Sequence, residues 1–158
     1  MNEQVLRVYV DTSVFGGAFD EEFRTPSQEF FAQGRAGRFE LVVSSLVEDE
    51  LALAPSVVRA LFEETAARDA TYVDITAEAD RLQEWYIQHS VLTARWGDDA
   101  LHVAIATVSG CSALVSWNFR HIVHYGRIPL FNAVNVLHGY GPIAIHSPSE
   151  VIRYEEDV

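Results

Sequence analysis

The chain contains no lysine, a single cysteine and no apolar run of membrane-spanning length. The lone Cys111 excludes an internal disulfide and a cysteine-based zinc site, and its apolar neighbours predict a small core residue. The first apolar run, from Val5 to Val10, is too short to cross a bilayer, and no signal-peptide pattern precedes it. We therefore expect a soluble, cytoplasmic protein without a membrane segment.

Positive charge is also scarce, since the chain has a formal net charge of −12 and a pI of about 4.7. A general nucleic-acid coat protein would normally be basic, so this class is disfavoured. The charge balance suits an acidic site that gathers cations, or a basic protein partner. All 11 cationic side chains are arginine, which makes bidentate contacts with phosphate, although codon bias explains the missing lysine more simply.

Strand and helix patterns alternate along the 158 residues, a length that suits a single domain over residues 1–158. Strands are predicted at Val5–Val10, Phe39–Val43, Tyr72–Ile75, Ala113–Val115 and Ile143–Ile145. Helices are predicted to begin near Thr25, Ser44, Pro55, Thr76, Gly97, Ile128 and Ser147. This alternation predicts an α/β fold, a three-layer α/β/α sandwich with a central parallel β-sheet. Sites in such folds form beyond the carboxyl ends of the strands.

Acidic residues fall at such positions. Asp11 directly follows the first strand, where an Asp can also be a simple turn or cap residue. In the next acidic segment, helical phase places Glu50 within the apolar stripe, whereas Glu48 stands three residues after Ser45, as in a capping box. An inward-facing Glu50 would need a buried arginine or a metal ion as its partner.

Asp98 and Asp99 open a helix that is apolar nearly all round. One of them could be its N-cap, but two adjacent carboxylates exceed what capping requires and favour a bound cation or a raised pKa. Asn118 follows a buried strand and is either a turn residue or a neutral oxygen ligand. Hard oxygen donors of this kind suit Mg²⁺ or Mn²⁺, so the sequence predicts a divalent metal site.

Four stretches carry a resemblance to a known family, and they are Val8–Ser13, Ser44–Leu51, Asp98–Ala106 and Leu114–Phe119. In this order they resemble the PIN-domain nucleases, the family that includes the VapC toxins of toxin–antitoxin pairs. The resemblance covers most of the chain. It implies an α/β/α sandwich that binds Mg²⁺ or Mn²⁺ and hydrolyses RNA phosphodiester bonds in the cytoplasm.

Carried over by position, the resemblance assigns catalytic roles to Asp11, Glu50 and Asp99, and it selects Asp99 over Asp98. It assigns metal binding to these three residues and to Asn118. Asn118 stands where the family often has a fourth Asp, which implies weaker metal binding or fewer ions. Accessory roles are predicted for Thr12, Ser13, Asp98 and Ser116. Phosphate contacts are predicted for Arg95, Arg120 and Arg127, although ordinary surface arginines would give the same pattern.

The implied reaction is metal-assisted hydrolysis, in which the ion orients a water and Glu50 or Asp99 takes its proton. The partners would be an RNA substrate, a cognate antitoxin and a second copy in a homodimer. The helix with Trp85 and Tyr86 could supply the dimer contact, although core packing is the simpler role for these rings.

Other classes fit less well. Haloacid dehalogenase-like phosphotransferases and response-regulator receivers need a lysine, and no Gly-x-Ser-x-Gly elbow indicates a serine hydrolase. His121 and His124 have transition-metal spacing but lack an evident acidic or cysteine partner. A PIN-like module that binds RNA or protein without cutting remains the main alternative.

Overall fold

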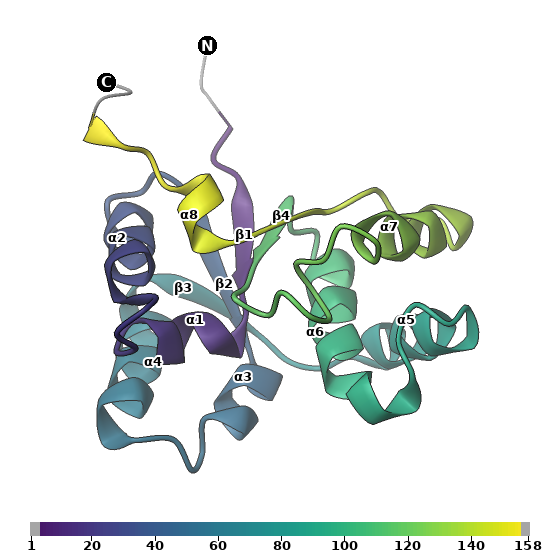
Figure 1. Cartoon of the computed structure of the whole chain (residues 1–158), viewed down its shortest axis with the longest axis horizontal. Coiled ribbons are helices and arrows are strands. Elements are labelled where there is room, and N and C mark those ends of the chain that lie inside the picture. Colours follow the sequence, from purple (N-terminus) through teal and green to yellow (C-terminus); the bar gives the residue numbers. More distant parts are fainter. Residues whose placement is uncertain (1–3, 156–158) are drawn as a thin grey trace.

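The computed structural model describes residues 4–155, and its centre is a five-stranded parallel sheet (Figure 1). The strands are β1 Arg7–Val10, β2 Glu40–Ser44, β3 Ala70–Val73, β4 Ala113–Val115 and β5 Ala144–His146. Their order across the sheet is β3-β2-β1-β4-β5, and all neighbouring pairs run parallel. The predicted α/β class is confirmed. One predicted strand, Tyr72–Ile75, begins two residues earlier than expected.

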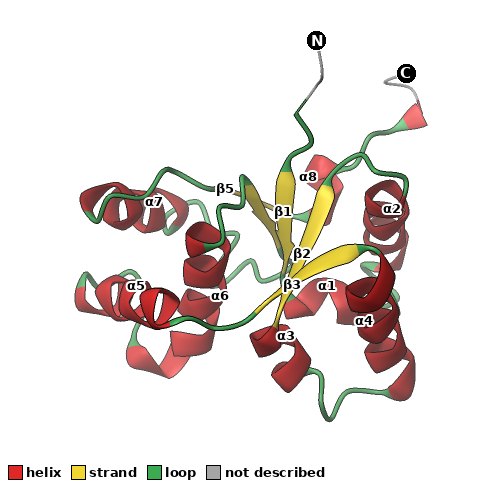
Figure 2. Ribbon diagram, turned by 180° about the vertical axis from the view of Figure 1, so that it is seen from behind, coloured by secondary structure: helices red, strands yellow, loops and turns green. Residues whose placement is uncertain are grey.

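Helices cover both faces of the sheet (Figure 2). One face carries α1 Thr12–Gly17, α2 Arg24–Arg35, α4 Ser56–Arg68 and α8 Pro148–Val151. The other carries α5 Ala77–Gln88, α6 Gly97–Val108 and α7 Ile128–Leu137, with the short 3₁₀ helix η1 Ala94–Trp96 before α6. The short α3 Ser45–Glu50 lies beyond the carboxyl end of β2. The result is the predicted three-layer α/β/α sandwich.

Strand β1 lies in the middle of the sheet and pairs with β2 on one side and β4 on the other. Its last three residues are buried, as expected for a central strand covered on both faces. The backbone N–H of Asp11 extends the pairing by donating to the carbonyl of Val115 at 3.0 Å. Since the strand order reverses at β1, the carboxyl ends of β1 and β4 open onto the crevice where such folds place their sites.

Helix α1 was not predicted, because the sequence indicated only a turn after β1. Asp11 is its N-cap, and its Oδ2 accepts the backbone N–H of Ser13 at 3.4 Å. Val14 and Phe15 are fully buried, so packing against α2 and α4 stabilises this six-residue helix. The helix fixes the direction in which Asp11 and Ser13 point.

One predicted helix cap is wrong, and one alternative for a second helix is excluded. Ser44, rather than Ser45, caps α3, and its Oγ accepts the N–H of Val47 at 3.4 Å. Ser45 Oγ accepts the N–H of Ile75 at 3.2 Å instead, so the capping box with Glu48 does not form. Helix α6 continues from η1 with Trp96 at its N-cap position, and therefore neither adjacent aspartate is an N-cap.

Buried side chains elsewhere follow the sequence expectations. Cys111 is buried, and burial raises the pKa of its thiol to about 12, as befits a core residue. Tyr86 is fully buried and hydrogen-bonds to Asn135, so its ring belongs to the core. Trp85 is half-buried and stacks on His138 with ring centroids 3.5 Å apart. Within residues 4–155, no helix has the length and apolarity needed to cross a membrane.

Candidate active site

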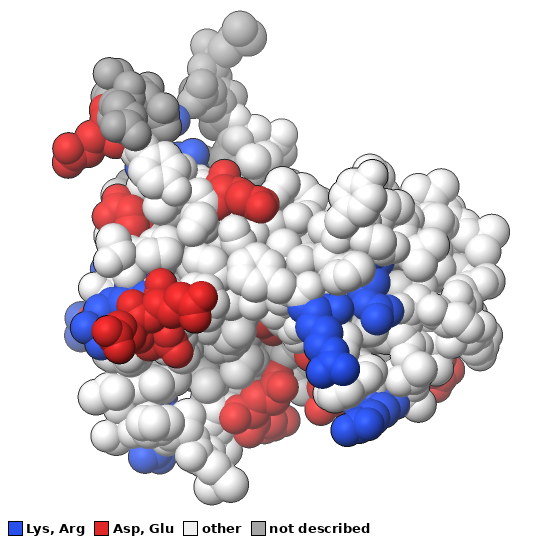
Figure 3. Space-filling model, in the orientation of Figure 1, with Lys and Arg blue, Asp and Glu red and all other residues white. Residues whose placement is uncertain are grey.

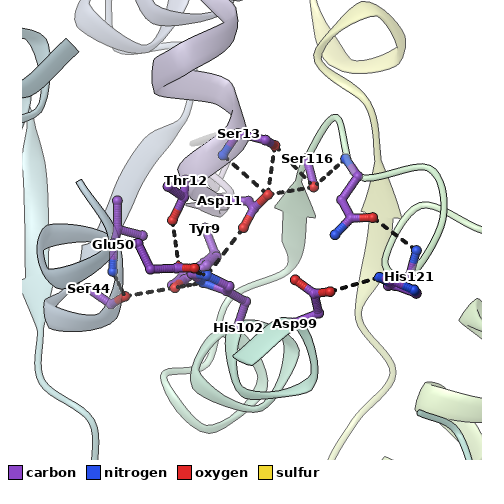
Figure 4. A network of polar contacts seen from close by, with 12 residues as sticks. Tyr9, Asp11, Thr12, Ser13, Ser44, Glu50, Asp99, His102, Ser116 and His121 are labelled. Carbon is purple, nitrogen blue, oxygen red and sulfur yellow. Dashed lines mark hydrogen bonds and ion pairs between the residues drawn. The ribbon is translucent and has the colours of Figure 1, made fainter. Parts of the chain in front are cut away.

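Four polar segments meet at the carboxyl ends of β1 and β4 (Figure 4). Asp11 follows β1, Glu50 ends α3, Asp99 lies in the first turn of α6, and Ser116 follows β4. Helix α6 runs beneath this point, so its amino-terminal turn faces the end of β1. The structure therefore brings the three predicted carboxylates into one polar network, although they are more than 35 residues apart along the chain.

The carboxylate of Asp11 is the most buried of the three, with 4% of the residue exposed. Its Oδ2 accepts hydrogen bonds from Ser13 Oγ and Ser116 Oγ, both at 2.7 Å. Its Oδ1 lies 3.4 Å from His102 Nε2. Hydroxyl donors and an imidazole thus replace the water that burial removes. The two serines were predicted as accessory residues, and both contact this carboxylate.

His102 is the site residue that the sequence reasoning missed. Its side chain is 2% exposed, its Nδ1 lies 2.7 Å from the Tyr9 hydroxyl, and its Nε2 contacts Glu50 Oε1 as well as Asp11. Tyr9 is in turn 2.8 Å from the hydroxyl of Ser44. A signal was present, because His102 stands three residues after Asp99 and so shares its helix face. Glu50, which was predicted to face inward, is instead an exposed residue, and the partner of its carboxylate is a histidine rather than an arginine.

The pKa values of this pair move in opposite directions. Burial by itself would lower the pKa of His102, but the charge of Asp11, the hydrogen bond to Glu50 and the charge of Glu50 raise it above 6.5. Burial likewise opposes ionisation of Glu50, yet the hydrogen bond and charge of His102, aided by Thr12, lower its pKa below 4.5. Thr12 Oγ1 donates to Glu50 Oε1 at 2.8 Å. Both shifts favour an imidazolium facing carboxylates.

Asp99 contacts a second histidine. Its Oδ2 lies 2.9 Å from Nδ1 of the buried His121, whose ring centroid is 4.2 Å from that of Trp96. Burial and the negative charge of Asp11 raise the pKa of Asp99, although His121 opposes this. His124 does not join the site, because it is exposed and its Nδ1 accepts the N–H of Gly126.

Asn118 shapes the turn after β4. Its Oδ1 accepts the backbone N–H of His121 at 3.0 Å, and its own N–H donates to Ser116 Oγ at 2.9 Å. These are the contacts of a turn residue, and they position His121 beside Asp99. Asp98, which precedes Asp99 in α6, is exposed to solvent.

The donor set fits a divalent cation in its chemistry, because three carboxylates and nearby hydroxyls supply hard oxygen ligands. The arrangement is different: within residues 4–155, no three His, Cys, Asp or Glu side chains surround one point as metal ligands do. The side chain of His102 contacts the carboxylates of Glu50 and Asp11, and the side chain of His121 contacts the carboxylate of Asp99. A divalent ion would therefore have to replace contacts that these imidazoles make.

The three arginines predicted to contact phosphate differ in how their guanidinium groups are held. The guanidinium groups of Arg95 and Arg120 lie over the Trp96 ring, 4.8 and 5.6 Å from its centroid. Arg127 instead donates to the backbone carbonyls of Arg120 at 3.2 Å and Val91 at 2.6 Å, which ties down the segment after β4. Figure 3 shows cationic side chains gathered over α6 and the β4–α7 segment, across from acidic side chains over α3.

Solved structures of other proteins share this architecture. The VapBC2 structure from Rickettsia felis, bound to a promoter DNA fragment, matches with a TM-score of 0.59 at 13% identity, covering 90% of this chain and 98% of that chain. VapC20 of Mycobacterium tuberculosis, described as a toxin that cleaves the sarcin–ricin loop, matches with a TM-score of 0.57 at 15% identity, covering 87% and 98%. No family model and no curated protein matches the sequence.

These similarities define the class of fold as that of a PIN domain. More narrowly, the fold is VapC-like, as the four sequence stretches predicted.

Proposed function

We propose that this protein is an endoribonuclease that hydrolyses RNA phosphodiester bonds with Mg²⁺ or Mn²⁺, as the toxin of a type II toxin–antitoxin pair. The observation that supports the proposal is that Asp11, Glu50 and Asp99 belong to one polar network at the carboxyl ends of β1 and β4. Negative charge gathered in a half-buried position favours a bound cation. The VapC-like fold supports the same activity.

The side chains would act as follows. Asp11, held by Ser13 and Ser116, together with Asp99 and Glu50 would bind the ion, which supplies charge neutralisation at the phosphate and a lowered water pKa. Asp99 has a raised pKa, and this suits it to receive a proton from the attacking water. Asn118 adds no charge, so we propose binding by three carboxylates rather than four.

Contacts with the substrate and with protein partners follow from the surface. Arg95 and Arg120 are exposed and flank Asp99, so we assign them to phosphate groups of the RNA. The R. felis structure contains VapB together with VapC, which supports a cognate antitoxin here. Helix α7 exposes Leu130, Val136 and Leu137 by 47, 62 and 66%, and we assign this face, rather than buried Tyr86, to a homodimer contact.

The direct test is RNA cleavage by Asp11→Asn and Asp99→Asn proteins with Mg²⁺, with Mn²⁺ and with EDTA. We expect a loss of at least about 100-fold in each variant, since each removes a charged ligand or proton acceptor. Asp49→Asn is the matched control, because Asp49 neighbours Glu50 and is exposed. Full cleavage by both variants would refute the assignment. Metal binding without cleavage of any RNA offered would favour the alternative, a catalytically inactive PIN-like binding module.

A further inference from the structure

Aromatic rings and two guanidinium groups lie along one rim of the carboxylate site. Arg95 and Arg120 both lie over Trp96. Phe119 follows, with its ring centroid 6.0 Å from that of Trp117, and Trp117 stacks on Phe23 at 4.3 Å. We call these six residues the aromatic–arginine stripe. They come from three separate parts of the chain, before α2, before α6 and after β4.

Both ends of this stripe connect to site carboxylates. At one end, Trp96 packs on His121, which contacts Asp99. At the other, the backbone N–H of Trp117 donates to Ser13 Oγ at 2.9 Å, and Ser13 donates to Asp11. The stripe therefore follows the rim between two of the three carboxylates. Its position relative to the polar network is fixed by these contacts.

Phe119 is the exposed member of the aromatic group. Half of its surface, 50%, is accessible to solvent, although the edges of Trp117 and Phe23 approach it at interplanar angles of 68° and 56°. Its neighbour Arg120 is also exposed. A large ring that is supported on one side and open on the other, beside a guanidinium group, has the composition of a stacking platform for single-stranded nucleic acid.

We propose that the aromatic–arginine stripe binds single-stranded RNA, with one nucleobase stacked on Phe119 and the adjoining phosphates on Arg120 and Arg95. The proposal rests on the ribonuclease function above, because the strand would then lead to the carboxylates. RNA is favoured over an apolar peptide because two guanidinium groups accompany the rings. In a chain of net charge −12, these arginines are a local exception to the repulsion of phosphate.

The test measures binding of a fluorescein-labelled single-stranded RNA octamer by anisotropy in EDTA, where no metal-dependent cleavage occurs. We expect Phe119→Ala to raise Kd by about 5- to 150-fold, which corresponds to the 1–3 kcal/mol typical for loss of one base–aromatic stack. Phe119→Trp should retain affinity. Phe119→Leu keeps apolar bulk without an aromatic face, and it should bind nearly as weakly as the alanine variant. Tyr125→Ala is the control, because Tyr125 is 94% exposed and outside the stripe.

An octamer with one abasic ribose separates stacking from phosphate contact. If the base at that position is the stacked one, wild-type affinity falls to that of Phe119→Ala, and the variant loses little more. Equal Kd values for wild type and Phe119→Ala would overturn the proposal. So would full affinity in Phe119→Leu, which would identify the patch as a general apolar surface for a protein partner. Binding is measured without cleavage, so failure of the two proposals can be told apart. If Asp11→Asn cleaves RNA as the wild type does but Phe119→Ala binds RNA more weakly, the nuclease assignment is wrong and the RNA-binding surface is retained.

Discussion

At the residue scale, the contacts of His102 with two carboxylates favour its cationic form. In an imidazolium both ring nitrogens donate, which here would direct Nδ1 to Tyr9 and Nε2 to Glu50 and Asp11. A buried charge of this kind is tolerable only because opposite charge and hydrogen bonds surround it. The same contacts keep the carboxylates of Asp11 and Glu50 from repelling each other.

Replacing His102 by glutamine should therefore lower the free energy of unfolding by about 3–5 kcal/mol, the usual cost of breaking a buried ion pair. The lower value is expected, because the Glu50 side chain is 31% exposed and partly screened by water. Urea denaturation at pH 6 measures the change. His124→Gln, at an exposed position, should change stability by less than about 0.5 kcal/mol. An equally small effect of His102→Gln would show that the pair contributes nothing to folding.

The pair also predicts a dependence of stability on pH. His102 has a raised pKa, so its contribution is fully present below 6.5 and is lost as pH rises through the raised value. Glu50 has a lowered pKa, so its contribution is present above 4.5 and is lost as pH falls through the lowered value. The stability difference between wild type and His102→Gln should thus be largest between pH 4.5 and 6.5. Urea denaturation across pH 4–9 measures it, and a difference that grows above pH 8 would contradict the charge assignment.

At the scale of elements, helix α1 contains two adjacent glycines, and one of them lies in close contact with other segments of the molecule. A Cβ on Gly17 would lie 2.8 Å from both Ser27 Oγ and Trp117 Nε1, whereas a Cβ on Gly16 would have no atom within 4 Å. Trp117 is also hydrogen-bonded to Ser27 through its ring nitrogen, so it cannot easily move aside. Gly17 is therefore required for the close approach of α1 to the segment after β4.

Gly17→Ala should destabilise the protein by about 1–3 kcal/mol, the usual cost of overpacking. Gly16→Ala, one position away in the same helix, should instead stabilise it by about 0.5–1 kcal/mol, because alanine loses less backbone entropy in a helix. Chemical denaturation of the two variants side by side measures the contrast. Equal effects would mean that the contact with Trp117 adjusts freely.

The elements that could be predicted are those with strong periodicity or buried apolar runs, such as β1 and α6. Helix α1 could not, because its sequence Thr12–Gly17 includes two glycines and β-branched residues, which disfavour an isolated helix. Packing of Val14 and Phe15 supplies what propensity lacks, and that contact depends on α2 and α4. The cap of α3 was misplaced for a similar reason, since contacts with neighbouring segments determine which residue precedes the first helical turn.

The carboxylates of the candidate site were predictable because each stands at the end of a patterned element. His102 was not, because an apolar helix offers several buried positions, and the pattern does not say which one faces a carboxylate from another segment. Arg127 illustrates the same limit, since its partners are backbone carbonyls brought near only by folding. Sequence located the charges, and tertiary structure determined how they are paired.

At the scale of the whole molecule, the excess of negative charge gives divalent ions a measurable effect on folding. If the carboxylate site binds Mg²⁺ or Mn²⁺, an ion at 100 times its Kd stabilises the native state by about 2.7 kcal/mol. Thermal unfolding with increasing Mn²⁺ should show a rising Tm in the wild type. The rise should be lost in Asp11→Asn and retained in Asp49→Asn. A wild-type Tm that is unchanged at millimolar Mn²⁺ would mean that His102 and His121 are not displaced.

The central place of β1 has a consequence for the order in which the protein is made. Strand β1 is synthesised before β4, with which it pairs in the folded sheet. The carboxylate of Asp11 likewise accepts a hydrogen bond from Ser116, which lies 105 positions later in the chain. Pairings this distant in sequence form late in folding. A nascent chain that ends before β4 carries Asp11, Glu50 and Asp99 without the assembled site. An enzyme proposed to cut RNA would thus lack an assembled active site until β4 and Ser116 have been synthesised.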